Sequence, residues 1–435
     1  MVGKEIIRKK FFVKRKKKYF DIKKRFFDPL INFLKKRKFD NLALYYPSSY
    51  ELNILNILEV EFLKKTKFLL PIITDKHSMH FCEWKNFDDE QLRICEYGVN
   101  KEMVPPWIML SLEDNVYRQK LRAELYVKYG LNQNDIGSLK RFSSTQKSEA
   151  QSKRIRIGYF SADFHIFPGM FLMAGMLEEH DRENFEIIAF SYGPDKNDSM
   201  RKRIVEAVDE FVDVHKNSVH QIVEIAREKN LDVAIHRNGH TRHAKTEIFA
   251  QRVAPVQINY LGYPGTIGGD FIDYIVADKV VLPEEHKSYY SEKVISLPHS
   301  YQPNDRKRTI VKTQTSRADF SLPEKAIVLC CFNNMFKITP LEFRIWMSVM
   351  KKIENSVLWL LKTNEKAENN LREEASKLGV KPTRLIFADK LPQDKHLARH
   401  QHADLFLDTF FYNAHTTASD ALWAGLPVVT KQGNQ

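Results

Sequence analysis

The sequence is poor in cysteine and has no long apolar run. Only four cysteines stand among 435 residues, with no CxxC pair and no regular spacing. This excludes a zinc ribbon and a disulfide scaffold, and it is typical of a protein kept in a reducing compartment. No run of about 18 apolar residues is present, so we expect no membrane-spanning helix. The first residues lack an apolar core followed by a small-residue cleavage site. We therefore expect no secretory signal and a cytoplasmic location.

The net charge of +13 is concentrated at one end of the chain. Residues 1–40 hold 16 Lys or Arg against four Asp or Glu, so the rest is nearly neutral. A basic arm can bind RNA, lipid headgroups or a phosphorylated ligand. A solvated amphipathic helix in a lysine-rich composition carries the same charge, and we favour that interpretation. We therefore expect neither a membrane nor a nucleic acid as partner.

Short apolar strands alternate with helices over most of the chain, which indicates an α/β fold with parallel sheets. We expect a small α/β segment at 1–102, a helix and polar linker at 104–153, and two lobes at 154–315 and 316–435. Ligands of such sheets bind at the carboxyl ends of the strands, here between the lobes. The expected strands are 155–160, 185–192, 233–235, 258–261, 274–277, 327–332, 356–361, 384–387, 405–408 and 428–430. The expected helices of the lobes are 170–179, 219–229, 340–352, 366–378, 396–402 and 417–424.

The segment 404–430 carries the clearest chemical signal. A strand is expected to end at Asp408 and, after a loop, a helix to begin near Thr416, so that His415, Thr416 and Thr417 lie at a helix N-terminus. Free N–H groups and the helix dipole attract phosphate there. Asp420, placed on the first turn, is a candidate partner for a ribose hydroxyl. An ordinary threonine-capped helix has the same pattern, and spacing alone favours that alternative.

The same segment resembles the nucleotide-diphosphate site of the O-linked N-acetylglucosamine transferases of the SPINDLY type. Their motif is close to xGHTTxxDxLWAGxPxVT. Five further stretches follow the order of that family, at 156–164, 172–181, 249–278, 289–301 and 332–340. The resemblance covers residues 104–435. It implies a glycosyltransferase B-type fold with two Rossmann-like lobes, the second one incomplete. It also implies inverting transfer of N-acetylglucosamine from UDP-GlcNAc to Ser or Thr hydroxyls of a protein whose identity the sequence does not reveal. The sugar is not fixed either, because SPINDLY uses fucose with the same motifs.

Transfer from a nucleotide diphosphate leaves a charged pyrophosphate that must be stabilised. The chain has no DxD motif, so we expect no metal and no cofactor besides the UDP-sugar donor. The resemblance implies that Lys337, a catalytic candidate, meets the β-phosphate near Thr416, that Asn334 lies on the donor side, and that His396 and Arg399 bind the uracil. Without the resemblance, Lys337 would be interpreted as a surface lysine, and His396 and Arg399 as part of a basic helix face.

In the family the loop that matches the GYPGT turn lines the sugar and acceptor pocket. The resemblance therefore implies that this pocket is lined by Gly262, Pro264, Gly265 and Thr266, with Gln257 as a neighbour. Glycine–proline turns also punctuate loops of no special function. On sequence alone both interpretations stand.

The sequence departs from the family after its first lobe strand. The family motif SxDFxxHxxxHLM reads SADFHIFPGMFLM here, so Phe167 and Phe171 replace two histidines. His165 is a catalytic candidate that substitutes in part, although a loop histidine is the favoured alternative. His240 stands where relatives commonly have an aromatic residue. These departures favour a second hypothesis, a nucleotide-sugar-binding pseudoenzyme.

Residues 1–102 have a resemblance of their own, to the N-terminal half of 5-formyltetrahydrofolate cyclo-ligases. It rests on KKFFVKRKK and on the stretches 42–59, 68–73, 79–84 and 92–99. It implies that basic residues meet ATP phosphates and that Glu51 meets the folate. The second half, with its glycine-rich phosphate loop, is missing. We therefore expect no cyclo-ligase activity, and a folate-pathway ligase is the third hypothesis.

Overall fold

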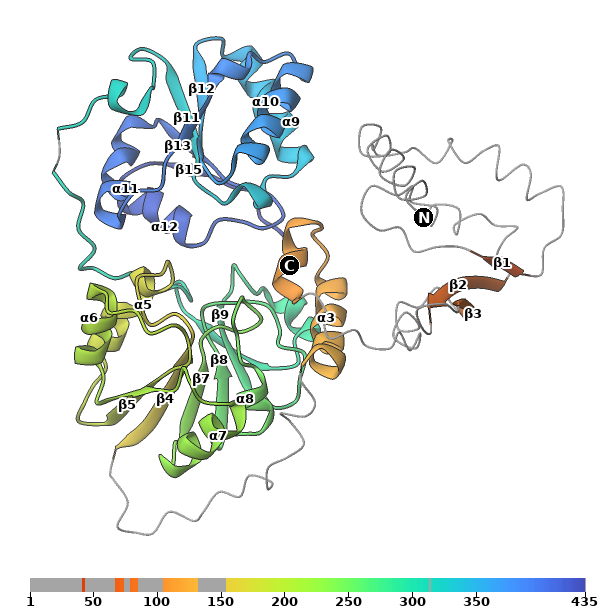
Figure 1. Cartoon of the computed structure of the whole chain (residues 1–435), viewed down its shortest axis with the longest axis vertical. Helices are drawn as coiled ribbons and strands as arrows, with labels where there is room; N and C mark the ends of the chain where they lie inside the picture. Colours follow the sequence, from red (N-terminus) through yellow and green to blue (C-terminus); the bar gives the residue numbers. More distant parts are fainter. Residues whose placement is uncertain are drawn as a thin grey trace, which may run out of the picture. The chain divides into compact units, whose positions relative to one another are not determined.

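The computed structural model describes residues 41–43, 67–73, 79–84, 105–131, 154–312 and 314–434, and divides the chain into the units Met1–Met103 and Val104–Gln435 (Figure 1). In the first unit, β1 (Asn41–Ala43) pairs parallel with β2 (Lys67–Ile73), which pairs antiparallel with β3 (Met79–Trp84). Strands β2 and β3 fall on the stretches 68–73 and 79–84 that our sequence analysis singled out. The other parts of the α/β segment expected at 1–102, and the linker at 132–153, lie outside the described residues.

The first lobe is a seven-stranded sheet in which every pair of neighbours is parallel, in the order β10-β9-β8-β7-β4-β5-β6. The chain enters at β4, an interior strand, runs outward to β6, and returns to β7 beside β4. This reversal marks the place where open α/β sheets bind ligands. The strands are β4 (Ile155–Ser161), β5 (Phe185–Ser191), β6 (Glu210–Asp213), β7 (Val233–His236), β8 (Val256–Asn259), β9 (Tyr274–Asp278) and β10 (Lys293–Leu297).

Helices cover both faces of this sheet, which is why its central strands read as continuous apolar runs. On one face Phe160 and Phe190 stack with ring centroids 4.3 Å apart, and on the other Tyr159 and Met173 are buried. The helices are α5 (Met170–Glu178), α6 (Ser199–Ala207), α7 (Val219–Glu228) and α8 (Glu247–Ala250). Our sequence analysis did not anticipate α6, α8, β6 or β10.

The second lobe repeats the design with five parallel strands in the order β13-β12-β11-β14-β15. The chain reverses between β11 and β14, so the carboxyl ends of these neighbours define the second place to look for a ligand. The strands are β11 (Ile327–Cys331), β12 (Ser356–Leu361), β13 (Leu385–Ala388), β14 (Leu405–Leu407) and β15 (Val428–Val429). The helices are α9 (Pro340–Lys352), α10 (Glu365–Lys377), α11 (Gln393–Arg399) and α12 (Thr416–Trp423). The expected α/β architecture with two parallel-sheet lobes is confirmed.

A helical segment ahead of the first lobe packs on the GYPGT turn. It consists of the 3-10 helix Pro106–Ser111, α3 (Val116–Leu125) and the π-helix Tyr126–Gly130. Gln119 Nε2 donates to the Tyr263 hydroxyl over 2.6 Å. Gly268 has φ of +76° and lies so close to α3 that a Cβ there would stand 2.5 Å from the Ala123 carbonyl carbon. Glycine at 268 therefore permits both the positive φ of this residue and its close packing against α3.

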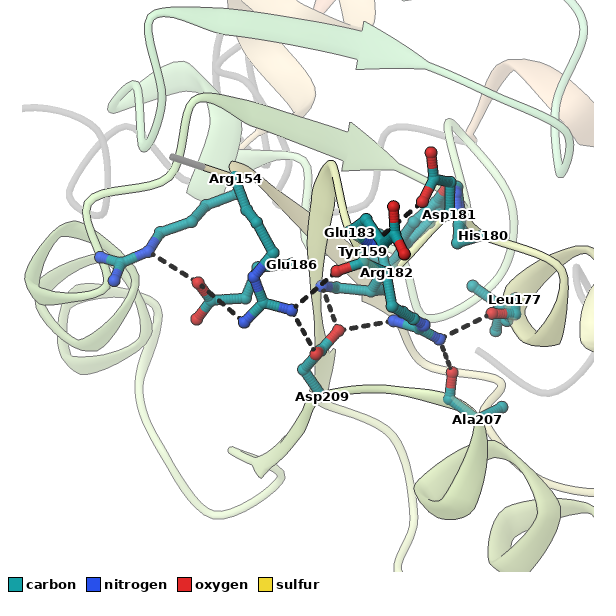
Figure 2. A network of polar contacts seen from close by, with 12 residues as sticks. Arg154, Tyr159, Leu177, His180, Asp181, Arg182, Glu183, Glu186, Ala207 and Asp209 are labelled. Carbon is teal, nitrogen blue, oxygen red and sulfur yellow. Dashed lines mark hydrogen bonds and ion pairs between the residues drawn. The ribbon is translucent and has the colours of Figure 1, made fainter. Parts of the chain in front are cut away.

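The amino ends of β4, β5 and β6 are tied together by charged side chains (Figure 2). Asp209 accepts from Arg154 over 3.0 Å, from Arg182 over 2.6 Å and from the Ile187 amide over 2.8 Å. Ion pairs thus occupy this edge of the sheet, and the polar groups open to a ligand have to be sought at the opposite, carboxyl edge. Among the helices that the structure describes, none is long and apolar enough to cross a membrane.

Candidate functional site

Lys337 and the start of α12 meet at the carboxyl edge of the second lobe. Lys337 ends the short 3-10 helix that follows β11, and α12 begins after the loop that leaves β14. The ammonium of Lys337 donates to the Asn413 carbonyl over 3.1 Å and lies 3.7 Å from the centre of the Tyr412 ring. Asn413 stands three residues before Thr416, so the Lys337 ammonium lies close to the start of α12.

The electrostatics of this place suit an anion. Burial lowers the pKa of Lys337 to about 8, although the Asp408 carboxylate opposes the shift. Burial, together with the charge of Lys337, lowers the pKa of His415 to about 4. At neutral pH the lysine is therefore mostly a cation and the histidine is neutral. The N–H groups that begin an α-helix add partial positive charge at the same point.

The loop between β14 and α12 is held by Asp408, which sequence reasoning had seen only as the end of a strand. Its Oδ1 accepts from the amides of Thr409 and Ala414, each over 2.7 Å, and its Oδ2 accepts from the Thr430 hydroxyl over 2.7 Å. Asn333 donates to Asp408 over 3.0 Å. A buried carboxylate with this many donors fixes the loop before any ligand arrives.

The two threonines at the helix start differ in their surroundings. Thr416 is the first residue of α12 and is half-buried. The Thr417 hydroxyl donates to the side-chain oxygen of Asn333, so it is engaged within the protein. Asn334 is exposed, and its side chain accepts from the Phe336 amide over 3.4 Å.

Asp420 lies on the second turn of α12, not on the first as expected, and it is buried among protein partners. Its Oδ1 accepts from Arg308 over 2.7 Å and from Gln393 over 3.0 Å. Burial raises the pKa of Asp420 to about 6 even with Arg308 beside it. The Oδ2 atom lies 3.7 Å from His396 Nε2, while the hydrogen bonds from Arg308 and Gln393 both go to Oδ1.

Arg399 is a core residue, with only 1% of its surface exposed. It donates to the Asp389 carbonyl over 2.6 Å, and its guanidinium carbon lies 4.3 Å from the centre of the Phe332 ring. Its Nη2 lies 2.6 Å from Nδ1 of His396, which therefore accepts this bond as a neutral imidazole. In this structure Arg399 orients His396, and His396 is the one of the two that lies beside Asp420.

The GYPGT turn lies at the carboxyl end of β8. The Gly262 amide donates to the Arg237 carbonyl over 2.9 Å, and a Cβ at Gly262 would stand 2.3 Å from that oxygen. Pro264 and Gly265 are half-buried. The Pro264 carbonyl accepts from the Tyr290 hydroxyl over 3.1 Å. Thus the turn is rigidly supported.

Two residues that we had placed near the sugar pocket point into the protein. The Thr266 hydroxyl is buried and donates to Glu292 over 2.7 Å. Gln257 is fully buried and donates to the carbonyls of Phe249 and Phe271 over 2.9 and 2.6 Å. Thr266 thus ties the turn to Glu292, and Gln257 links the segments around Phe249 and Phe271. Neither presents its polar atoms to a ligand in this structure.

His165 and Phe167, in the loop after β4, lie side by side. His165 is buried, its Nδ1 has no hydrogen-bond partner in the described part of the chain, and its ring stacks on Phe167 at 5.8 Å. Phe167 is 39% exposed, whereas Phe171 packs against the core. His240 Nε2 lies 2.7 Å from the Ile267 carbonyl oxygen, so this histidine has a structural contact.

Sequence reasoning missed a buried polar cluster beside His165. Asp163 accepts from both Arg237 and Asn238, the second over 2.7 Å. The Asn238 side-chain oxygen accepts from the Tyr192 hydroxyl over 3.0 Å. The cluster joins the carboxyl ends of β4, β5 and β7, and the polar HRNG sequence directly after an apolar strand was the available signal.

Two parallel-sheet lobes, with a lysine set at a helix N-terminus on the carboxyl edge of the second, define a two-lobed transferase of the glycosyltransferase B type. The family model described as glycosyl transferase family 41 matches residues 82–314 and 304–435, and the chain belongs to that family. The match begins inside the segment that resembles cyclo-ligases, and that second resemblance stays a prediction.

The relatives agree with this assignment. The chain is 38% identical over 289 residues to the probable UDP-N-acetylglucosamine–peptide N-acetylglucosaminyltransferase SEC of Arabidopsis thaliana, covering 65% of this chain and 30% of the relative. It is 25% identical over 407 residues to the UDP-N-acetylglucosamine–peptide N-acetylglucosaminyltransferase of Caenorhabditis elegans, covering 68% and 35%. The chain thus spans about a third of the length of these curated relatives.

A solved structure shows the same fold. An O-GlcNAc transferase mutant from Thermobaculum terrenum superimposes with a TM-score of 0.67 at 24% identity, covering 78% of this chain and 63% of that one. Among the residues described, no group of three or more His, Cys, Asp and Glu side chains is arranged to hold a metal ion. Metal-independent chemistry remains a prediction.

Proposed function

We propose that this protein transfers N-acetylglucosamine from UDP-GlcNAc to Ser or Thr hydroxyls of a protein acceptor, with inversion and without a metal, in the cytoplasm. The observation that carries the proposal is the position of Lys337 at the N-terminus of α12, in a chain of glycosyl transferase family 41. The names of the relatives supply the donor and the peptide acceptor.

The second lobe supplies what the leaving group needs. Charge builds up on the UDP diphosphate as the bond to the sugar breaks, and fixed donors at that position lower the barrier. The Lys337 ammonium and the first N–H groups of α12 are such donors, and Asp408 holds their loop in place. No divalent ion is required for this task.

The first lobe raises the alternative of a pseudoenzyme. A general base must accept the proton of the acceptor hydroxyl, and Phe167 has no atom that can do so. His165 lies against Phe167, and burial, first among several causes, lowers its pKa, so its ring is neutral at pH 7 and able to accept a proton. His165 is therefore our candidate base. If it does not act, the protein binds the nucleotide sugar without turning it over.

The test is UDP binding by calorimetry, followed by UDP release from UDP-GlcNAc with and without a mixture of peptide acceptors. We expect UDP to bind and Lys337→Met to weaken binding by about tenfold or more, since a charge-assisted contact is lost. Lys352→Met, on the exposed end of α9, is the matched control. Binding with turnover supports the transferase, binding without turnover supports the pseudoenzyme, and a parent protein that does not bind UDP overturns both.

A further inference from the structure

The linker that follows β10 lies against α12 of the second lobe. Three of its side chains contact three residues of that helix or its cap. The Tyr301 hydroxyl lies 2.9 Å from His415 Nδ1, Gln302 donates to the Ser419 hydroxyl, and Arg308 pairs with Asp420. His415 is the N-cap of α12. Of the three contacts, the one to His415 therefore lies nearest the proposed diphosphate position.

Tyr301 is itself held by the first lobe. Its amide donates to Asp278, at the end of β9, over 2.9 Å, and its carbonyl accepts from the Tyr260 hydroxyl over 2.9 Å. The backbone of Tyr301 is hydrogen-bonded through both its amide and its carbonyl, and its ring is buried, so the position of the hydroxyl is restricted. This makes Tyr301 a rigid support for whatever it contacts.

The hydrogen bond between Tyr301 and His415 has a preferred direction. A buried phenol O–H needs an acceptor, and in the part of the chain that the structure describes His415 Nδ1 is its hydrogen-bond partner. If Nδ1 carried the proton instead, the phenol proton would be left without an acceptor, at a cost of about 1–3 kcal/mol. The geometry therefore favours donation from Tyr301 to Nδ1.

The proton of the imidazole then has to be on its other nitrogen. The low pKa of His415 makes the ring neutral at pH 7, and a neutral imidazole has one N–H and one bare nitrogen. With Nδ1 accepting, the N–H is at Nε2. A bare Nε2 would present a lone pair to a phosphate oxygen and repel it, whereas an N–H attracts it.

We propose that Tyr301 is a positioning residue that holds His415 in the Nε2–H form, so that the imidazole donates a hydrogen bond to the diphosphate at the start of α12. The inference rests on the proposed function, because it names a further group of the same donor site. It also gives the first lobe a role in donor binding, because the first lobe holds Tyr301, and Tyr301 sets the tautomer of His415 in the second lobe.

The first test needs no ligand. The protein labelled with ¹⁵N-histidine is measured by long-range ¹H–¹⁵N NMR, and the signals of His415 are assigned by their loss in His415→Gln. We expect the Nε2–H form to dominate in the parent and a mixture of both forms in Tyr301→Phe. Tyr159→Phe is the matched control, because Tyr159 lies 2.9 Å from Nε2 of His180 in another, partly buried tyrosine–histidine pair. It should change His180 and leave His415 as it was.

The second test is a double-mutant cycle on UDP affinity. The glutamine side chain of His415→Gln keeps an N–H donor near the Nε2 position and has no tautomers. We expect Tyr301→Phe to weaken UDP binding by about five- to tenfold in the parent and by less than about twofold in His415→Gln. Tyr159→Phe should change the affinity in neither background.

The outcomes separate the inference from the proposed function. A parent protein with the His415 proton on Nδ1 overturns the inference even if Tyr301→Phe does not fold. An equal loss in both backgrounds also overturns it, since Tyr301 would then act only on the overall structure. A parent that does not bind UDP, yet shows the Nε2–H form that Tyr301→Phe loses, refutes the donor site while the tautomer assignment stands.

Discussion

Arg308 of the linker and Asp420 of α12 form an ion pair of 2.7 Å with both side chains almost entirely buried. The pair joins residues 112 positions apart, and Arg308 also lies with its guanidinium carbon 4.9 Å from the centre of the Trp423 ring. Asp420 was expected to meet a ribose, and in this structure one of its oxygens is already occupied. A ribose hydroxyl would therefore have to reach Oδ2, beside His396.

Removing Arg308 should destabilise the protein strongly. The change Arg308→Met leaves the Asp420 carboxyl buried without its cation, and breaking one partner of a buried pair costs about 3–5 kcal/mol. Urea unfolding measures the loss. Lys377→Met, which breaks the exposed pair with Glu374, is the control and should cost less than about 0.5 kcal/mol. A loss below about 1 kcal/mol for Arg308→Met would show that the pair contributes little.

UDP affinity should fall as the pH rises through about 8. The pKa of Lys337 is lowered by burial to about 8, so its cation is present below that pH and is lost above it. If only the cation binds the diphosphate, affinity at pH 9 should be about tenfold lower than at pH 7. Calorimetry over this range measures the effect. In Lys337→Met the affinity should be weak and nearly constant across the same range, and a parent-like fall in that variant would assign the titration to another group.

Chelation of divalent ions should leave UDP binding unchanged. In the proposed site the diphosphate meets Lys337 and the N–H groups of α12, which would neutralise its charge in place of a metal. Calorimetric titrations with and without EDTA should agree within about twofold. A tenfold loss, which corresponds to about 1.4 kcal/mol, would reveal a metal that takes part in binding.

Restoring a histidine at position 167 should raise turnover and leave UDP affinity alone. Phe167 is 39% exposed, so the change Phe167→His costs little packing, whereas Phe171 contributes to the core and is best kept. A general base contributes typically about 10²–10⁴-fold to the rate. The measurement is UDP release at saturating UDP-GlcNAc.

Ile166→His is the control for that experiment. Ile166 is 52% exposed, and this substitution places a histidine one position before residue 167. If the parent protein already turns over and Phe167→His does not raise that rate, the general base is elsewhere. In that case His165→Gln should abolish turnover without weakening UDP binding.

Local sequence patterns determined most of the strands and most of the helices of the two lobes. Apolar runs such as 327–331 form buried parallel strands wherever helices cover both faces, and Thr339 with Glu342 forms the cap that starts α9. The start of α12 after His415 was also readable, because the end of an apolar strand and a threonine pair stand close together in the sequence. These features depend on neighbours within a few residues, so the sequence alone reveals them.

Side-chain direction was decided by the tertiary structure. Arg399 and Thr266 carry polar groups that suit a ligand, yet Arg399 is packed on Phe332 and Thr266 donates to Glu292. The partner of Asp420 is likewise distant in sequence: it is Arg308, in the linker that follows β10. A polar group enters the interior only where a partner satisfies it, and these partners stand far away in the sequence. No local pattern reveals these partners, so it was packing that directed the polar groups of Arg399 and Thr266 toward the interior.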